Sequence, residues 1–149
     1  MQIRHIGLAL MTMIALGCSS ETLAPEPVTL ESLAGRYTLM RVEGKPLPAT
    51  LGVCFIGGCG SVATIISGTL EIGGESQTGW ELAISQIGEG VMPRTTTYAG
   101  REITIEGNAV LLWLMEPANP AMDKFSATAN GSVLVVWTGL WTYEFRRAR

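Results

Sequence analysis

The sequence predicts an all-β domain whose antiparallel strands form a barrel or a sandwich. From Leu33 onward, apolar and polar residues alternate with a period of two, which is the pattern of a strand with one buried face. Turn-forming residues interrupt this alternation at short intervals. No stretch keeps a helical period of about 3.6 residues between capping residues. Short strands at such regular spacing are typical of these two architectures.

The strand segments follow one another along the chain with turn residues between them. The first segment ends at Gly44. Because Pro46 and Pro48 cannot continue a central strand, residues 45–61 are expected to form a loop. The predicted strand segments, which we expect to form a barrel or sandwich of about eight strands, are 36–43, 62–72, 80–87, 94–98, 101–106, 109–115, 123–129, 132–138 and 140–147.

Residues 1–17 have the shape of a secretory signal. Arg4 and His5 form a short basic start, and an apolar run from Ile6 to Leu16 follows. The run is too short to cross a bilayer of about 30 Å as a helix. A buried helix of the mature fold is the alternative. The position at the extreme N-terminus, ahead of a proline-containing segment, favours the signal.

The junction Ala15-Leu16-Gly17-Cys18 resembles the lipobox of bacterial lipoproteins. The resemblance implies that Cys18 receives a lipid thioether and becomes the first residue of the mature chain, with further acylation giving firm anchoring. An Asp after the cysteine commonly retains Gram-negative lipoproteins in the inner membrane, and this chain has Ser19. The resemblance therefore implies a lipid-anchored protein of the cell envelope, in the outer membrane facing the periplasm or at the cell surface.

This interpretation divides the chain into three parts. Residues 1–17 are the signal peptide, 18–32 are the lipidated cysteine and a tether, and 33–149 are the barrel domain. Pro25 and Pro27 lie among scattered polar residues in the tether, which predicts a semi-extended segment. An ordinary frayed terminus makes nearly the same prediction.

The composition excludes several classes of function. With 10 Lys and Arg against 13 Asp and Glu, the net charge is −3, so no basic surplus indicates a nucleic-acid partner. The only histidine is His5, in the segment expected to be removed, and the only aspartate is Asp123. Acid–base, nucleophilic and metal chemistry therefore lack their usual residues. We expect no enzymatic activity, no metal and no cofactor.

With Cys18 assigned to lipid, Cys54 and Cys59 remain, separated by four residues. In an oxidising compartment such a pair predicts a disulfide, and Gly57 and Gly58 allow the chain to turn between the two cysteines. Two free thiols are an alternative. A redox-active pair is a third interpretation, although the CxxC spacing of redox motifs is missing.

The motif Gly35-Arg36-Tyr37-Thr38-Leu39, followed by Val42-Glu43-Gly44-Lys45-Pro46-Leu47-Pro48, resembles the opening of bacterial lipocalin-like lipoproteins. The resemblance implies a small antiparallel up-and-down β-barrel of about eight strands. In lipocalins, an arginine on the last strand covers an aromatic ring near the first strand. The resemblance assigns the glycine and the ring to Gly35 and Tyr37, and the covering cation to Arg146 or Arg147.

The same resemblance implies a cavity for a small hydrophobic ligand. A filled core is the alternative, because a barrel of about eight strands either fills with side chains or holds one small ligand. The candidate lining residues are the aromatic side chains Tyr37, Trp80, Trp113, Trp137, Trp141 and Tyr143.

The run from Ala109 to Met115 is apolar on both faces of its predicted strand, so one face needs cover. We expect Leu112 and Leu114 on the outer face, where an apolar patch would mark contact with an envelope protein, a second copy or a membrane. Cover by the tether or by the loop 45–61 is the alternative. Two functions remain open: an anchored barrel that binds a small hydrophobic ligand, or a packed module that docks to an envelope partner.

Overall fold

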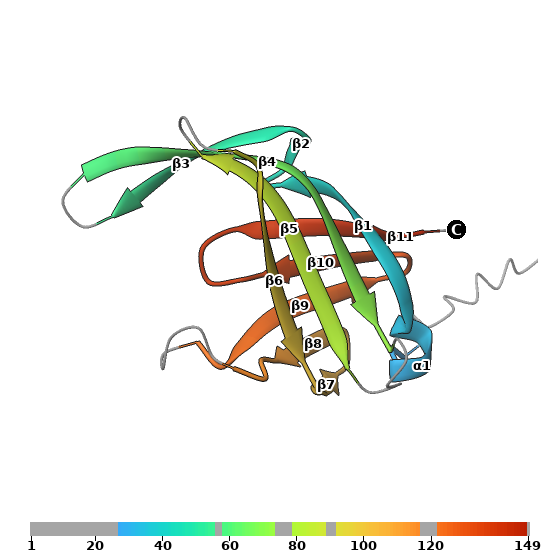
Figure 1. Cartoon of the computed structure of the whole chain (residues 1–149). Helices are drawn as coiled ribbons and strands as arrows, with labels where there is room; N and C mark the ends of the chain where they lie inside the picture. The colour runs from blue at the N-terminus through green and yellow to red at the C-terminus, as the bar shows by residue number, and fades with distance from the viewer. Residues whose placement is uncertain (1–26, 56–57, 74–78, 89–91, 117–121, 149) are drawn as a thin grey trace, which may run out of the picture.

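A computed structural model describes residues 27–55, 58–73, 79–88, 92–116 and 122–148 of the chain, with the backbone alone described for 53–55 and 58–61 (Figure 1). Within this part, the helix α1 (Leu30–Leu33) precedes a sheet of eleven strands. The strands are β1 (Gly35–Val42), β2 (Lys45–Pro46), β3 (Ala49–Phe55), β4 (Gly58–Ile72), β5 (Trp80–Gly88), β6 (Arg94–Gly100), β7 (Glu102–Glu106), β8 (Ala109–Trp113), β9 (Lys124–Asn130), β10 (Val133–Trp137) and β11 (Thr142–Arg147).

The sheet forms a nearly closed, antiparallel up-and-down barrel, which confirms the predicted fold class. Its hydrogen-bonded order is β6-β5-β4-β1-β11-β10-β9-β8-β7. Every neighbouring pair is antiparallel. Because β1 pairs with β11, the first and last of these strands lie side by side in the middle of the sheet. Figure 1 shows β4, β5 and β6 crossing in front of β9, β10 and β11, so the barrel has two opposed walls.

The structure has more strands than the predicted eight or so. β2 and β3 both lie within 45–61, the segment that the sequence predicts to be a loop, and that prediction was wrong. In the part of the chain that the structure describes, each of these strands pairs on one side only, β2 with β1 and β3 with β4. Pro46 is tolerated in β2 because an edge strand does not need a hydrogen-bond donor on both sides.

The barrel comes close to closing where β6 passes the end of β8. The amide of Met115 donates to the Ala99 carbonyl over 2.9 Å, and the indole N–H of Trp80 donates to the Trp113 carbonyl over 3.1 Å. A Cβ at Gly100 would lie only 1.8 Å from the Trp113 carbonyl oxygen. Gly100 therefore permits the backbone approach on which this part of the barrel depends.

Alternating side chains of each strand fill the interior. In β8, Val110 and Leu112 are fully buried, whereas Leu111 and Trp113 lie on the outer side and are half-buried. The expectation that Leu112 faces outward was wrong, because the pairing of β8 with β9 sets the opposite phase. Leu114 also packs against the core and not on the outer face.

A two-stranded ribbon projects from the barrel at the end away from α1 (Figure 1). It consists of β3 and the first part of β4, paired from Ala49↔Ile65 to Phe55↔Gly58. The pairing of β4 with β5 begins only at Ala63↔Gly88. The part of β4 before Ala63 therefore has β3 as its one neighbouring strand in the described structure.

Candidate functional site

The barrel wall divides the six candidate ligand-lining aromatic residues into an inner and an outer group. Tyr37, Trp80 and Tyr143 are buried in the interior. Trp113 is half-buried on the outer side of β8, and Trp137 lies on the outer side of β10 with 53% of its surface exposed. The remaining residue, Trp141, precedes β11 and packs partly against the core. The six side chains therefore do not surround one common space.

Inward-facing aromatic side chains meet beside the place where β6 passes the end of β8. The ring of Phe125 on β9 lies with its centroid 5.8 Å from that of Trp80 on β5. Its centroid is 5.1 Å from that of Tyr98 on β6, and these two rings meet edge to face. Such aromatic contacts are the arrangement of a packed core. Phe125 was missing from the predicted residues, although the alternation of β9, with Phe125, Ala127 and Ala129 buried, marks it as inward-facing.

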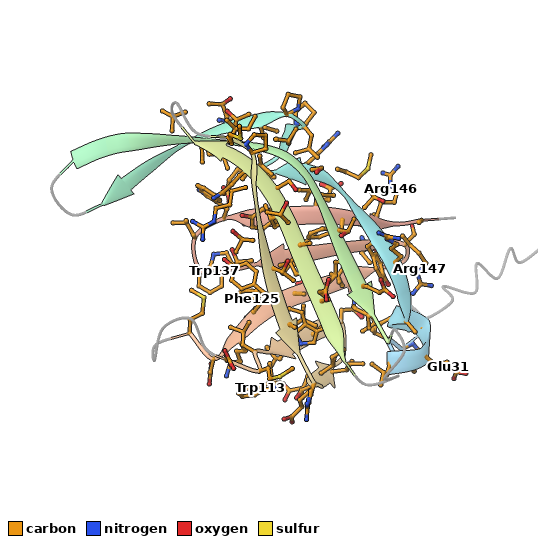
Figure 2. The ribbon with its side chains drawn as sticks, viewed as in Figure 1. Glu31, Trp113, Phe125, Trp137, Arg146 and Arg147 are labelled. Atoms are coloured by element: carbon orange, nitrogen blue, oxygen red, sulfur yellow. The ribbon has the colours of Figure 1, made fainter. Side chains whose placement is uncertain are left out.

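The end of the barrel near α1 is covered by Arg147 (Figure 2). Its guanidinium carbon lies 5.3 Å from the centroid of the Tyr37 ring, and its Nη2 donates to the Tyr37 hydroxyl over 2.9 Å. The same nitrogen donates to the carbonyl of Ser32, and the Tyr37 hydroxyl donates to the carbonyl of Leu33 over 2.8 Å. These bonds tie the last strand and the first strand to α1. Arg146, the other candidate, is exposed.

Gly35 leaves room for this arrangement. Its φ of +138° is one that residues with a side chain rarely adopt, and a Cβ there would lie 3.6 Å from Nε of Arg147. Val28 and Leu30, which the sequence assigns to the tether, pack against the core beside this end. The packed domain therefore includes residues on the N-terminal side of Leu33.

Tyr143 is the one described group with a clearly displaced pKa. Burial raises the pKa of its hydroxyl above the ordinary value of 10.0, and the neighbouring Tyr98 and Glu43 add to the rise, while a hydrogen bond with Thr138 opposes it. The hydroxyl is therefore neutral at physiological pH.

The outer side of the wall formed by β8 to β11, here called the back wall, carries the half-buried Trp113 and the exposed Trp137. The indole N–H of Trp113 donates to Oγ1 of Thr104 over 3.0 Å, and Nζ of Lys124 lies 4.3 Å from the centroid of the Trp113 ring. These contacts fix Trp113 against the surface. Trp137 and Leu140 have exposed fractions of 53% and 54%. Figure 2 shows Trp137 directed away from the barrel.

The three cysteines differ in what the structure describes of them. Cys18 lies outside the described residues, as does His5. The backbone register pairs Cys54 directly with Cys59 across β3 and β4, next to a register shift between Val53 and Cys54. The side chains of 53–61 are outside the described part, so the disulfide stays a prediction.

Among the described residues, no group of three or more His, Cys, Asp and Glu side chains is placed to hold a metal ion. The same part of the chain contains no helix with the length and apolar character needed to cross a bilayer. Comparisons of the chain with protein-family models, with curated proteins and with solved structures gave no match in any of the three.

Proposed function

We propose that this chain is a lipid-anchored protein of the bacterial cell envelope whose packed barrel acts through its outer surface as an interaction module. The observation that carries the proposal is the contact of Phe125 on β9 with Trp80 on β5 and Tyr98 on β6, at centroid distances of 5.8 and 5.1 Å on the inner side of the barrel. Side chains that pack together inside a barrel occupy space that a small ligand would need. Catalysis has no part in this proposal.

A ligand panel tests the packed core against the other candidate function, a barrel that holds a small hydrophobic molecule. A ligand at about 100 times its Kd stabilises the folded state by about 2.7 kcal/mol. We expect no such thermal stabilisation with fatty acids of different lengths, and no quenching of tryptophan fluorescence. Saturable stabilisation by one of them would replace the interaction module with the ligand-binding function.

The lipid anchor is supported by the Ala15-Leu16-Gly17-Cys18 junction and the apolar run before it. Several acyl chains are needed for firm anchoring, because each buried CH₂ contributes about 0.8 kcal/mol and one chain binds reversibly. Mass spectrometry of the native N-terminus should find an acylated Cys18, and Cys18→Ser should abolish processing. An N-terminus that begins at an unmodified Met1 would exclude the anchor.

The outer side of the back wall supports docking to an envelope protein. Exposed aromatic residues are often the anchors of protein interfaces. Trp137 is half exposed there, and Leu111 lies on the same side of the wall with Ser126 between them. A crosslinked envelope partner should be lost in Trp137→Lys and kept in Thr97→Lys, a matched change at an exposed position of the front wall. Equal recovery of the partner with both variants would exclude this docking face.

A disulfide between Cys54 and Cys59 completes the proposal. It is supported by their direct pairing in the backbone register of β3 and β4, since cross-strand partners have Cα atoms about 4.5–5.5 Å apart and disulfides span about 4.4–6.8 Å. Peptide mapping without reduction should find the two cysteines linked in protein taken from the envelope. Two thiols that react with an alkylating reagent before reduction would count against it.

A further inference from the structure

The free edge of β3 is available for hydrogen bonding over the described part of the chain. β3 pairs with β4 on one side only. Nζ of Lys45 donates to the carbonyl of Thr50 over 3.5 Å, so a group outside the β3–β4 pair reaches this carbonyl. Main-chain groups alternate in direction along a strand, so every second residue of β3 directs its N–H and C=O to the free edge. Because a carbonyl oxygen has two lone pairs, the Thr50 carbonyl can accept a second hydrogen bond beside the one from Lys45.

The absence of charge distinguishes this edge from the other strands at the ends of the sheet. Residues 46–70 contain no Asp, Glu, Lys, Arg or His. In contrast, β7 carries an exposed glutamate at each end, Glu102 and Glu106, and β6 begins with the exposed Arg94. Proteins use charged residues on edge strands to prevent pairing with other chains. The β3 edge lacks that protection beyond Lys45.

Among the described residues, none requires a glycine at position 52. A Cβ there would meet nothing within 4 Å, and its φ is outside the range that favours glycine. A glycine inside a strand weakens the strand, and it often marks a place where another backbone approaches closely. The residue paired with Gly52 on β4, Val62, has 38% of its surface exposed.

We propose that the free edge of β3 pairs antiparallel with the same edge of a second copy of this chain, about a two-fold axis at Gly52. This interface is isologous: the same edge is used by both copies, and if one residue faces a second residue of the other copy, the second faces the first in return. Thr50 then lies opposite Cys54 of the second copy, and no like charges face each other. Self-pairing of β7 about its centre would instead place Glu102 opposite Glu106. The interface goes beyond the proposed function and does not depend on the lipid anchor.

A bilayer does not suit this edge as its occupant. Hydrocarbon offers no hydrogen-bond partner, and each unpaired backbone group placed there costs several kcal/mol. A second strand satisfies the free N–H and C=O groups of β3 directly. Pairing also turns two ribbons of two strands into one sheet of four, and sheets of three or more strands are the ones that are stable in water.

Sedimentation velocity on the full chain, extracted from the envelope in a mild detergent, tests the interface. We expect a species of twice the chain mass for the wild type. Gly52→Lys places two lysines opposite each other and should raise the dimer dissociation constant at least about tenfold, equivalent to about 1.4 kcal/mol. Gly88→Lys is the matched control, because a Cβ at Gly88 also meets nothing within 4 Å, and it should leave the dimer intact.

Three results would overturn the interface: a wild-type chain that stays monomeric up to about 100 µM, a dimer that Gly52→Lys leaves unchanged, or equal loss of the dimer in both variants. Photo-crosslinking in intact cells provides a measurement on the otherwise unaltered ribbon. A photoreactive residue at the exposed Thr50 should give a band of twice the chain mass, and one at the exposed Thr97 should not. Crosslinks from Thr50 to lipid or to a different protein alone would assign the edge to another occupant and reject the dimer.

Discussion

Replacement of Gly100 by alanine should be among the most damaging small changes in this barrel. The added Cβ would lie 1.8 Å from the Trp113 carbonyl oxygen and 2.3 Å from Nε1 of Trp80. Those two atoms are the partners of the 3.1 Å hydrogen bond that links β5 to β8. The methyl group therefore meets a backbone atom on one side and a buried ring on the other, and neither can move aside without separating the two walls.

The expected loss combines two physical effects. Forcing an extra methyl group into a packed site costs about 1–3 kcal/mol, and leaving a buried N–H without its acceptor costs about 1–3 kcal/mol more. We therefore expect the free energy of unfolding to fall by about 2–6 kcal/mol, a large part of the 5–15 kcal/mol or so that is typical of a domain. Trp80→Phe should not rescue Gly100→Ala, because the clash with the Trp113 carbonyl remains.

Equilibrium urea denaturation of Gly100→Ala, with Gly88→Ala as the control, measures this loss. An added Cβ at Gly88 meets nothing within 4 Å. There, the same substitution should be neutral or stabilise the fold by about 0.4–1 kcal/mol, because it reduces the freedom of the unfolded chain. The reasoning would be refuted if Gly100→Ala unfolded within about 0.5 kcal/mol of the wild type, since the walls would then not be held at this distance by the glycine.

Three further predictions concern the ends and the walls of the barrel. Arg147→Lys should lower the free energy of unfolding by about 1–2 kcal/mol because it loses the contacts with Tyr37, whereas Arg146→Lys should change it by less than about 0.5 kcal/mol; equal effects in urea denaturation would contradict this. The raised pKa of Tyr143 stabilises the folded state fully below pH 10.0, and this contribution is lost as the pH rises above that value, so Tyr143→Phe should flatten the alkaline decrease in stability; an unchanged decrease would remove the assignment. Leu112→Lys should unfold the domain while Leu111→Lys should leave its circular dichroism spectrum unchanged, and tolerance of both would contradict the inward phase of β8.

The sequence predicts the barrel strands well because two local signals agree for them. In β9 and β10, predicted as 123–129 and 132–138, alternation defines the strands and Asn130-Gly131 supplies the turn between them. Gly131 has the positive φ of 57° that such a turn requires. A period of two with a strong turn is sufficient to locate a hairpin without knowledge of its neighbours.

Other features depend on contacts between distant segments, which one sequence does not display. Alternation places Leu111 and Leu112 on opposite faces of β8, but only the pairing with β9 decides which of them faces inward. The same phase of β8 places Trp113 on the outer side of the wall, whereas Trp80 on β5 is buried. Gly100 resembles an ordinary turn glycine in the sequence, and its role appears only when β8 lies against β6. A ligand-lining set chosen by aromatic type therefore mixed the inner and the outer side of the wall.

The buried residues at the base of the β3–β4 ribbon do not by themselves explain what keeps its outer part folded. Ala49 and Leu51 are buried where the ribbon leaves the barrel, but beyond Ala63 its strands have only each other as described neighbours. Few buried side chains then offset the entropy lost by ordering the chain. A disulfide between Cys54 and Cys59 would contribute about 2 kcal/mol by restricting the unfolded chain, at any protein concentration. Pairing between copies contributes only above the dissociation constant of the dimer and grows with concentration. The dependence of ribbon stability on protein concentration therefore separates the two sources.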